Sequence, residues 1–179
     1  MLQKRNDLEI VLLLLDTKMH LRQIAKSLKL VPSTAMRVLN KLEKDSILDF
    51  TMEGKNKTYS LKETPEARHF KYIAEHYRLL KTLQKPLIRN IYKEIIQMTS
   101  GELILIFGSY ASSSETAKSD IDLYVETTDR KLSEDIRKLS EKIQLQAGKL
   151  DKDSSIAKEI IKNHVILQNV ERFYQAIKG

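Results

Sequence analysis

The chain of 179 residues contains no cysteine, which excludes disulfide bonds and thiolate metal sites. Its hydrophobic run from Ile10 to Leu15 is far too short to span a bilayer. Asp7 and Glu9 precede this run and no small-residue cleavage site follows it, which argues against a secretory signal peptide. Internal repeats and low-complexity tracts are also absent. We therefore expect a cytoplasmic protein that forms one large domain or two small ones.

Charge is distributed unevenly along the sequence. Residues 1–99 contain 19 Lys and Arg against 11 Asp and Glu, a net charge of +8. Residues 100–179 contain 12 against 13, a net charge of −1. The basic excess therefore lies entirely in the first half, which predicts that this half contacts a polyanion.

Two acidic side chains stand at the start of a predicted strand in the second half. The apolar run Leu103–Phe107 is short enough for a buried strand, and a second strand is predicted at Ile121–Val125. Because strand side chains alternate, Asp120 and Asp122 should point to the same face. Neighbouring carboxylates repel each other unless a cation lies between them, and Mg²⁺ prefers such oxygen ligands. The alternative is that Asp120 is a turn residue and Asp122 is merely solvated.

The turn that follows the first of these strands contains Gly108 and Ser109. Glycine lets the backbone approach a ligand closely, and the turn amides could face phosphate oxygens. A phosphate-binding turn beside a metal-binding pair predicts phosphoryl or nucleotidyl transfer. Gly108-Ser109, ten further residues and Asp120-Ile121-Asp122 together resemble the signature of the DNA polymerase beta-like nucleotidyltransferases, in particular their minimal members. The resemblance implies that Gly108 and Ser109 bind a nucleoside triphosphate, with ATP expected, and that the catalytic pair Asp120 and Asp122 binds Mg²⁺.

A third carboxylate usually completes the site in active members of that superfamily, on the next strand. Here the strand predicted at Ile143–Ala147 carries Gln144 and Gln146, and an amide cannot accept a proton at neutral pH. One alternative is a transferase that modifies a protein or another hydroxyl acceptor. The other is a transcription regulator whose transferase domain is impaired and only binds nucleotide. Modification of bound DNA or RNA is a third option, less favoured because small cores of this kind lack a channel for a polymer end.

The first sixty residues predict three helices and a hairpin. Apolar spacing predicts helices at 6–15 and 21–28 and a third one beginning near Ser33, followed by strands at 47–51 and 58–61. This order resembles the winged helix-turn-helix DNA-binding domain over about residues 6–63. The resemblance implies that the third helix and the hairpin, or wing, contact double-stranded DNA. The implied contacts are Ser33, Thr34, Arg37 and Lys41 on the helix and Lys55, Asn56 and Lys57 on the wing.

Two positions depart from the usual winged-helix pattern. Lys29 stands where the family often has glycine in the turn, and Val31 stands where Ser or Thr often caps the recognition helix. A winged helix that contacts another protein, with its charges on an ordinary solvated face, is the alternative.

Two amphipathic helices are predicted between these parts, beginning at Pro65 and Pro86. We expect their apolar stripes to pack in the core or between domains, and the first helix could also form the interface of a homodimer. The whole is expected to be an α+β protein: a winged helix at 1–63, connecting helices at 64–99 and a mixed α/β nucleotidyltransferase core with a small sheet at 100–179. The stripes are Phe70, Ile73, Ala74, Tyr77 and Leu80 on the first helix, and Leu87, Ile91, Ile95 and Met98 on the second.

Overall fold

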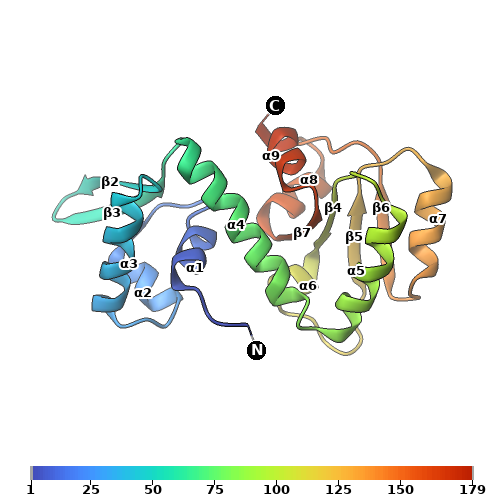
Figure 1. The fold of residues 1–179 in the computed structure, drawn as a ribbon, viewed down its shortest axis with the longest axis horizontal. Coiled ribbons are helices and arrows are strands. Elements are labelled where there is room, and N and C mark those ends of the chain that lie inside the picture. Colours follow the sequence, from blue (N-terminus) through green and yellow to red (C-terminus); the bar gives the residue numbers. More distant parts are fainter. Residues whose placement is uncertain (1, 179) are drawn as a thin grey trace. The chain divides into compact units, whose positions relative to one another are not determined.

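The computed structural model describes residues 2–178, which form two compact units with the boundary between Tyr77 and Arg78. Each unit has its own β-sheet and its own hydrophobic core (Figure 1). The division falls within helix α4, Pro65–Thr82. Among the described residues, no helix combines the length and the hydropathy needed to cross a membrane.

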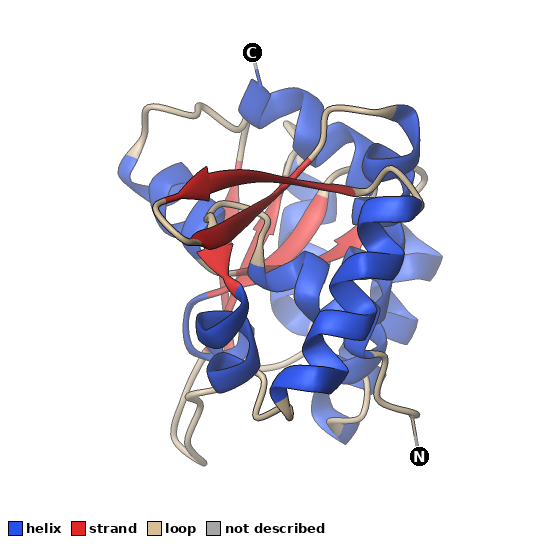
Figure 2. Cartoon of the chain, turned by 90° about the vertical axis from the view of Figure 1, so that its left-hand side faces the viewer, coloured by secondary structure: helices blue, strands red, loops and turns tan. Residues whose placement is uncertain are grey.

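The first unit is a winged helix. Its elements are, in order, α1 (Asn6–Leu13), β1 (Met19–His20), α2 (Leu21–Ser27), α3 (Pro32–Lys44), β2 (Leu48–Glu53) and β3 (Asn56–Leu61). The strands form an antiparallel sheet in the order β1-β3-β2, seen at the front of Figure 2. The short strand β1 has no counterpart in the sequence-based prediction. It is only two residues long, and its pairing partner β3 lies about forty positions further along the chain.

Local signals explain how α2 and α3 are joined. His20 caps α2: its Nδ1 accepts a hydrogen bond from the backbone N–H of Gln23, and the backbone N–H of His20 donates to Oε1 of Gln23. Lys29 has φ +53, so it adopts the left-handed conformation for which related turns use glycine. Val31 gives α3 no side-chain cap, but Pro32 begins the helix, where its missing N–H costs nothing.

The wing is a tight hairpin. Glu53 pairs with Asn56, which leaves Gly54 and Lys55 as a two-residue loop. Gly54 has φ +61 and no atom within 4 Å of a hypothetical Cβ. Glycine therefore supplies the positive φ that such hairpin turns need, without any packing requirement.

Helix α4 buries part of its predicted stripe. Ala74 and Tyr77 are buried, whereas Ile73 and Leu80 are 49% and 48% exposed. The prediction that Ile73 and Leu80 pack in a core is therefore wrong within this chain. The buried face is rotated around the helix axis and includes Glu75 instead.

Helix α5, Pro86–Met98, is rotated in the same sense. It buries Ile88, Ile91 and Ile95, while Leu87 and Met98 are 36% and 40% exposed. Burial of Leu87 and Met98 is thus a wrong prediction. The predicted and the observed buried residues of α5 overlap because both follow a helical repeat. Only contact with the sheet decides which of them is buried.

The second unit is built on a four-stranded mixed sheet with the order β6-β5-β4-β7. Strands β4 and β5 are antiparallel, β4 and β7 are antiparallel, and β5 and β6 are parallel. The elements are β4 (Ile104–Phe107), α6 (Gly108–Ser112), β5 (Ile121–Val125), α7 (Arg130–Lys138), β6 (Ile143–Ala147), α8 (Ser155–Lys162), β7 (His164–Gln168) and α9 (Val170–Lys178).

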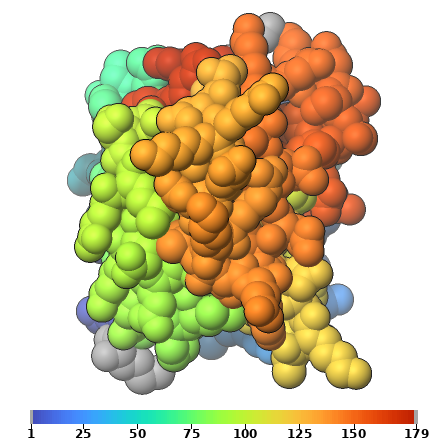
Figure 3. All heavy atoms as spheres, turned by 90° about the vertical axis from the view of Figure 1, so that its right-hand side faces the viewer, coloured from blue at the N-terminus to red at the C-terminus, as the bar shows by residue number. Residues whose placement is uncertain are grey.

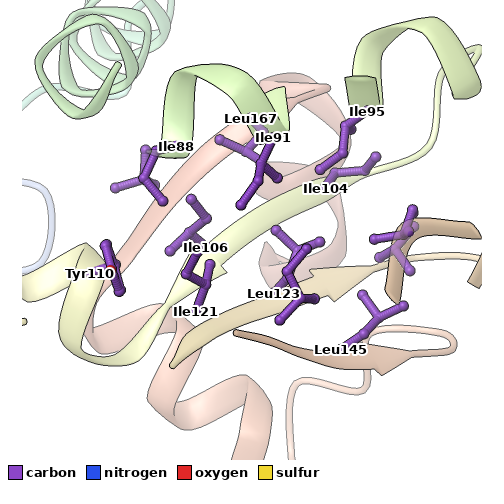
Figure 4. Packing of buried hydrophobic residues seen from close by; sticks show 14 of the residues in the cluster. Ile88, Ile91, Ile95, Ile104, Ile106, Tyr110, Ile121, Leu123, Leu145 and Leu167 are labelled. Atoms are coloured by element: carbon purple, nitrogen blue, oxygen red, sulfur yellow. The ribbon is translucent and has the colours of Figure 1, made fainter. Parts of the chain in front are cut away.

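One face of this sheet packs on α5 and α7. Ile88, Ile91 and Ile95 of α5 lie over Ile106 and Leu123 of the central strands (Figure 4). Figure 3 shows the outer surface of α5 in yellow-green beside the orange segment that contains α7. Because side chains alternate along a strand, Phe107, Asp122, Gln144 and His164 lie on the opposite face. The candidate site residues Asp122 and Gln144 therefore lie on the face that α5 and α7 leave free.

Candidate functional site

Gly108 and Asp122 lie against each other at the end of β4. Phe107 pairs with Asp122, so Gly108 follows directly beside that carboxylate. Gly108 has φ +64, a conformation that L side chains rarely adopt. A Cβ built at this position would overlap Oδ2 of Asp122. Glycine is therefore required both for the backbone conformation and for the close approach of the carboxylate.

The predicted Gly108-Ser109 turn is the start of the short helix α6. Phe107 precedes this helix and supplies no side-chain cap to its first N–H groups. The Ser112 hydroxyl donates to the carbonyl oxygens of Gly108 and Ser109, which lie 3.0 and 3.2 Å away. The bend is thus held from within, and its first residue, Gly108, lies against Asp122.

The Asp122 carboxylate is subject to burial and to the charge of two other carboxylates. Burial raises the pKa of Asp122, and the negative charges of Glu159 and Asp120 raise it further. Within residues 2–178, none of these three carboxylates has a side-chain hydrogen bond or an ion pair. Asp122 is therefore a partly buried acid whose negative charge no cation of the described chain compensates.

Strand pairing explains why Glu159 comes near Asp122. Phe107 pairs with Asp122 on one side and with His164 on the other, so these three residues cross the sheet in one row. His164 Nδ1 lies 2.8 Å from the carbonyl oxygen of Ile160, which anchors the end of α8 beside this row. Glu159 immediately precedes Ile160 and so lies on the same side of the sheet.

The oxygen donors fit a magnesium ion that also binds a substrate. Mg²⁺ is commonly held by one or two carboxylates together with substrate phosphates and water. Asp120 and Asp122 supply such a pair. The pKa of Asp122 is raised mainly by burial and further by the charges of Glu159 and Asp120, and a bound cation would offset both effects. In the described part of the chain, no group of three His, Asp or Glu side chains could enclose a metal unaided. Phosphate and water oxygens would have to complete the coordination.

Strand β6 carries glutamine at the positions where a third carboxylate of the metal site is expected. Gln144 pairs with Asp122 and Gln146 with Tyr124 in the parallel ladder, so both amides share the face of Asp122. Both are exposed, whereas Ile143 and Leu145 are buried. Gln144 is the closer of the two in register, and it carries no charge.

The segment between α6 and β5 is fixed at two points. Lys85 Nζ lies 2.5 Å from Oε1 of Glu115, and Lys142 Nζ donates to the carbonyl oxygen of Ala117 at 2.7 Å. In the same segment, the Ser119 hydroxyl accepts a hydrogen bond from the backbone N–H of Thr116. The chain that leads into Asp120 is therefore held in place, which favours a preformed site.

Helix α3 presents a polar and basic surface. Ser33, Arg37 and Lys41 are exposed and Thr34 is half-buried, while Ala35, Leu39 and Leu42 face the core. Asn40 and Lys44 are exposed on the same surface. Hydroxyl, amide and cationic groups of this kind bind phosphates and base edges.

The wing residues differ in how far they are engaged by the protein itself. Lys55 and Asn56 are exposed. Lys57 Nζ lies 3.6 Å from Oε2 of Glu43 and 3.5 Å from the centre of the Phe50 ring. Lys57 therefore holds the wing against α3, and of the two lysines Lys55 is the one without an ion pair in the described chain.

Comparison with known protein families identifies the second unit. Residues 89–172 match the family model described as "Polymerase beta, Nucleotidyltransferase". The second unit carries a nucleotidyltransferase domain of the polymerase beta family. This confirms the resemblance drawn from Gly108-Ser109 and Asp120-Ile121-Asp122. The match contains all of these residues as well as Gln144 and Glu159.

Solved structures share parts of the fold at low similarity. The adhesin competence repressor AdcR from Streptococcus pyogenes is 20% identical, with a TM-score of 0.40 over 54% of this chain and 68% of that one. The zinc-responsive MarR family member ZitR from Lactococcus lactis is 21% identical, with a TM-score of 0.38 over 50% of this chain and 64% of that one. A toxin-antitoxin structure with AMP-PNP is 16% identical, with a TM-score of 0.34 over 57% of this chain and 83% of that one. The chain thus spans about two thirds of the length of the two regulators. No curated protein sequence matches the chain.

Within the nucleotidyltransferase domain, Glu159 is the residue that the sequence did not reveal. It lies 37 positions after Asp122, on a helix rather than on a strand, and belongs to no motif. The pairing of Phe107 with both Asp122 and His164 brings the end of α8 to this row, where Glu159 acts on the charge of Asp122.

Proposed function

We propose that the nucleotidyltransferase domain transfers a nucleotidyl group from a nucleoside triphosphate, ATP being the expected one, to a hydroxyl group of a protein or another acceptor. We also propose that the reaction depends on Mg²⁺ and that the winged helix binds double-stranded DNA. The main support is the packing of the Asp122 carboxylate on the backbone of Gly108. A carboxylate thus lies against the first residue of α6, and we infer that the uncapped amides at the start of this helix bind the phosphates of a metal-bound triphosphate.

Each site residue has a distinct role in this proposal. Asp120 and Asp122 hold Mg²⁺, which when bound offsets the negative charge of the phosphates. The amides of Gly108 and Ser109 bind the terminal phosphates of the triphosphate. The positioned phosphates leave the α-phosphorus open to attack by the acceptor.

The proposed reaction is a substitution at the α-phosphorus. The acceptor oxygen forms a bond to this phosphorus, and the bond from phosphorus to the oxygen that bridges to the β-phosphate breaks. Pyrophosphate leaves with that oxygen and its electron pair. We assign the acceptor proton to the Glu159 carboxylate, because a carboxylate can accept a proton and the amide of Gln144 cannot.

A second function from a different class is favoured by one observation. Gln144 lies in register with Asp122, where a third acid would complete the metal site. In this alternative the protein is a transcription regulator whose domain binds a nucleotide without transferring it. DNA binding by the first unit would then be the main activity.

One experiment separates the two functions. The full chain is incubated with α-labelled ATP and Mg²⁺ in host-cell lysate, with EDTA and the double variant Asp120→Asn, Asp122→Asn as controls. Label on a protein or RNA band that both controls abolish supports transfer, and the nature of the band identifies the acceptor. Mg²⁺-dependent binding of a non-hydrolysable triphosphate without any labelled band supports the regulator. If the double variant binds the triphosphate as well as the wild type does, the assignment of both aspartates fails.

The proposed DNA contacts are the recognition helix and the wing. Ser33, Thr34, Arg37 and Lys41 would contact the major groove, and Lys55, Asn56 and Lys57 the flanking backbone. We keep 1–63 as the DNA-binding part, 64–99 as connecting helices and 100–179 as the transferase part. The exposed side chains Ile73 and Leu80 of α4 are the proposed homodimer contact. Light scattering of Ile73→Glu against the wild type tests this, since a monomeric wild type would contradict it.

A further inference from the structure

The first unit contains a cavity that the proposed function does not use. It has a volume of 330 Å³ and opens between the beginning of α1 and one side of α3. Residues Lys4 to Asp7 line it from the first of these elements, and Arg37, Val38 and Lys41 from the second. Its volume lies at the lower end of the range for small-molecule sites, about 300–1,000 Å³.

Positive charge dominates the lining of this cavity. Asp7 is its single acid, and both of its carboxylate oxygens are bound by Arg5, with Nε to Oδ1 at 3.0 Å and Nη2 to Oδ2 at 2.7 Å. Lys4 Nζ donates only to the carbonyl oxygen of Leu28, at 3.3 Å. In the described chain, neither Arg37 nor Lys41 has a carboxylate partner. Three uncompensated cations, those of Lys4, Arg37 and Lys41, therefore surround the cavity.

A second feature of the lining is an unsatisfied amide. Oδ1 of Asn6 is buried and has no hydrogen-bond partner. Leaving a buried polar atom unpaired is costly, and such an atom is commonly explained by a partner that the bare chain lacks. Asn6 lines the cavity, and rotation of its side chain would turn the amide, which has both donors and an acceptor, towards a ligand.

We propose that this cavity binds a small phosphate monoester and that its occupation competes with DNA. A phosphate monoester carries a charge of about −1.5 to −2 at neutral pH, which three surrounding cations can neutralise. A guanidinium such as that of Arg37 binds two phosphate oxygens at once. Competition rests on the proposed DNA-binding function, because Arg37 and Lys41 would serve both ligands.

The first test measures binding without DNA. Calorimetry of the full chain with AMP, and separately with inorganic phosphate, is carried out in EDTA, so that Mg²⁺-dependent binding to the transferase domain is suppressed. The double variant Asp120→Asn, Asp122→Asn should bind AMP as the wild type does. Stronger binding of AMP than of inorganic phosphate indicates a nucleotide-like ligand, and equal binding indicates the phosphate group alone.

Variants then locate the site. Lys4→Gln and Asn6→Leu should each weaken AMP binding about tenfold or more. Lys26→Gln replaces an exposed lysine on α2 that does not line the cavity; it is the matched control and should leave AMP binding unchanged. Lys4 is exposed, so its replacement should leave the fold intact. Thermal unfolding tests whether Asn6→Leu is as stably folded as the wild type. Absence of AMP and phosphate binding, or equal binding by all three variants, would overturn the proposal.

The second test adds DNA. AMP at ten times its wild-type dissociation constant should weaken DNA binding by the wild type about elevenfold, but by Lys4→Gln about twofold or less, because that variant binds AMP about tenfold more weakly. If Lys4→Gln weakens DNA binding as much as Arg37→Ala does and AMP has no effect, the cavity wall belongs to the DNA interface and the ligand site is refuted. If AMP binds as predicted and no DNA binds at all, the cavity assignment stands and the proposed function of the winged helix fails.

Discussion

Replacement of Gly108 by alanine should damage the transferase site more than the fold. At φ +64 an alanine costs roughly 1–2 kcal/mol of backbone strain. For a unit of about this size, that corresponds to a melting temperature lower by about 4–16 °C. The new Cβ would also occupy the position of Oδ2 of Asp122, so the carboxylate must turn away. Because a shift of about 1 Å in a reacting group costs about 100-fold, transfer of label from α-labelled ATP should fall at least that far.

Gly54→Ala is the matched control. Gly54 has φ +61, so it carries the same backbone strain, but no atom lies within 4 Å of its added Cβ. It should lower the stability of the first unit by a similar amount and leave nucleotidyl transfer at the wild-type rate. Thermal unfolding and the transfer assay are measured on both variants. If Gly108→Ala transfers label as well as Gly54→Ala does, the close packing of Asp122 on Gly108 has no role in catalysis.

Three further predictions concern single residues. Because the folded protein raises the pKa of Asp122, it binds that proton more tightly than the unfolded chain does, and stability is lost as the pH rises from the ordinary pKa through the raised one. Asp122→Asn should therefore raise the melting temperature at pH 7 without Mg²⁺, and the gain should disappear near pH 3; an unchanged melting temperature at pH 7 would show that the carboxylate is not destabilising. Gln144→Asp should tighten Mg²⁺-dependent triphosphate binding about tenfold in calorimetry if this position completes the metal site, and unchanged affinity would leave Glu159 as the only third acid. In DNA titrations, Arg37→Ala should relax the sequence preference. Lys55→Ala should reduce the affinity for all sequences and make the slope of log K against log salt concentration about one unit less steep. Identical effects of the two variants would contradict the assignment of Arg37 to the groove and of Lys55 to the DNA backbone.

Pattern alone located several elements closely. Strands at 121–125 and 143–147 and the helix from Pro86 to Met98 follow the predicted bounds, because short apolar runs and helical repeats are local properties. The helix faces were less well predicted. Leu87 and Met98 fit a helical repeat as well as Ile88 does, and only the sheet below α5 selects which of them is buried.

The sequence by itself determined the chemistry that this protein has available. The spacing of Gly108-Ser109 and Asp120-Ile121-Asp122 identifies the nucleotidyltransferase domain, since both segments are short and their roles depend on residue type. Only the tertiary structure decided which side chains lie close to one another. Pairing of β4 with both β5 and β7 brings Glu159 near Asp122, and packing of α1 on α3 places Lys4 and Asn6 beside Arg37. The proximity of residues so far apart in the sequence depends on strand register and on the packing of elements, which no local sequence pattern encodes.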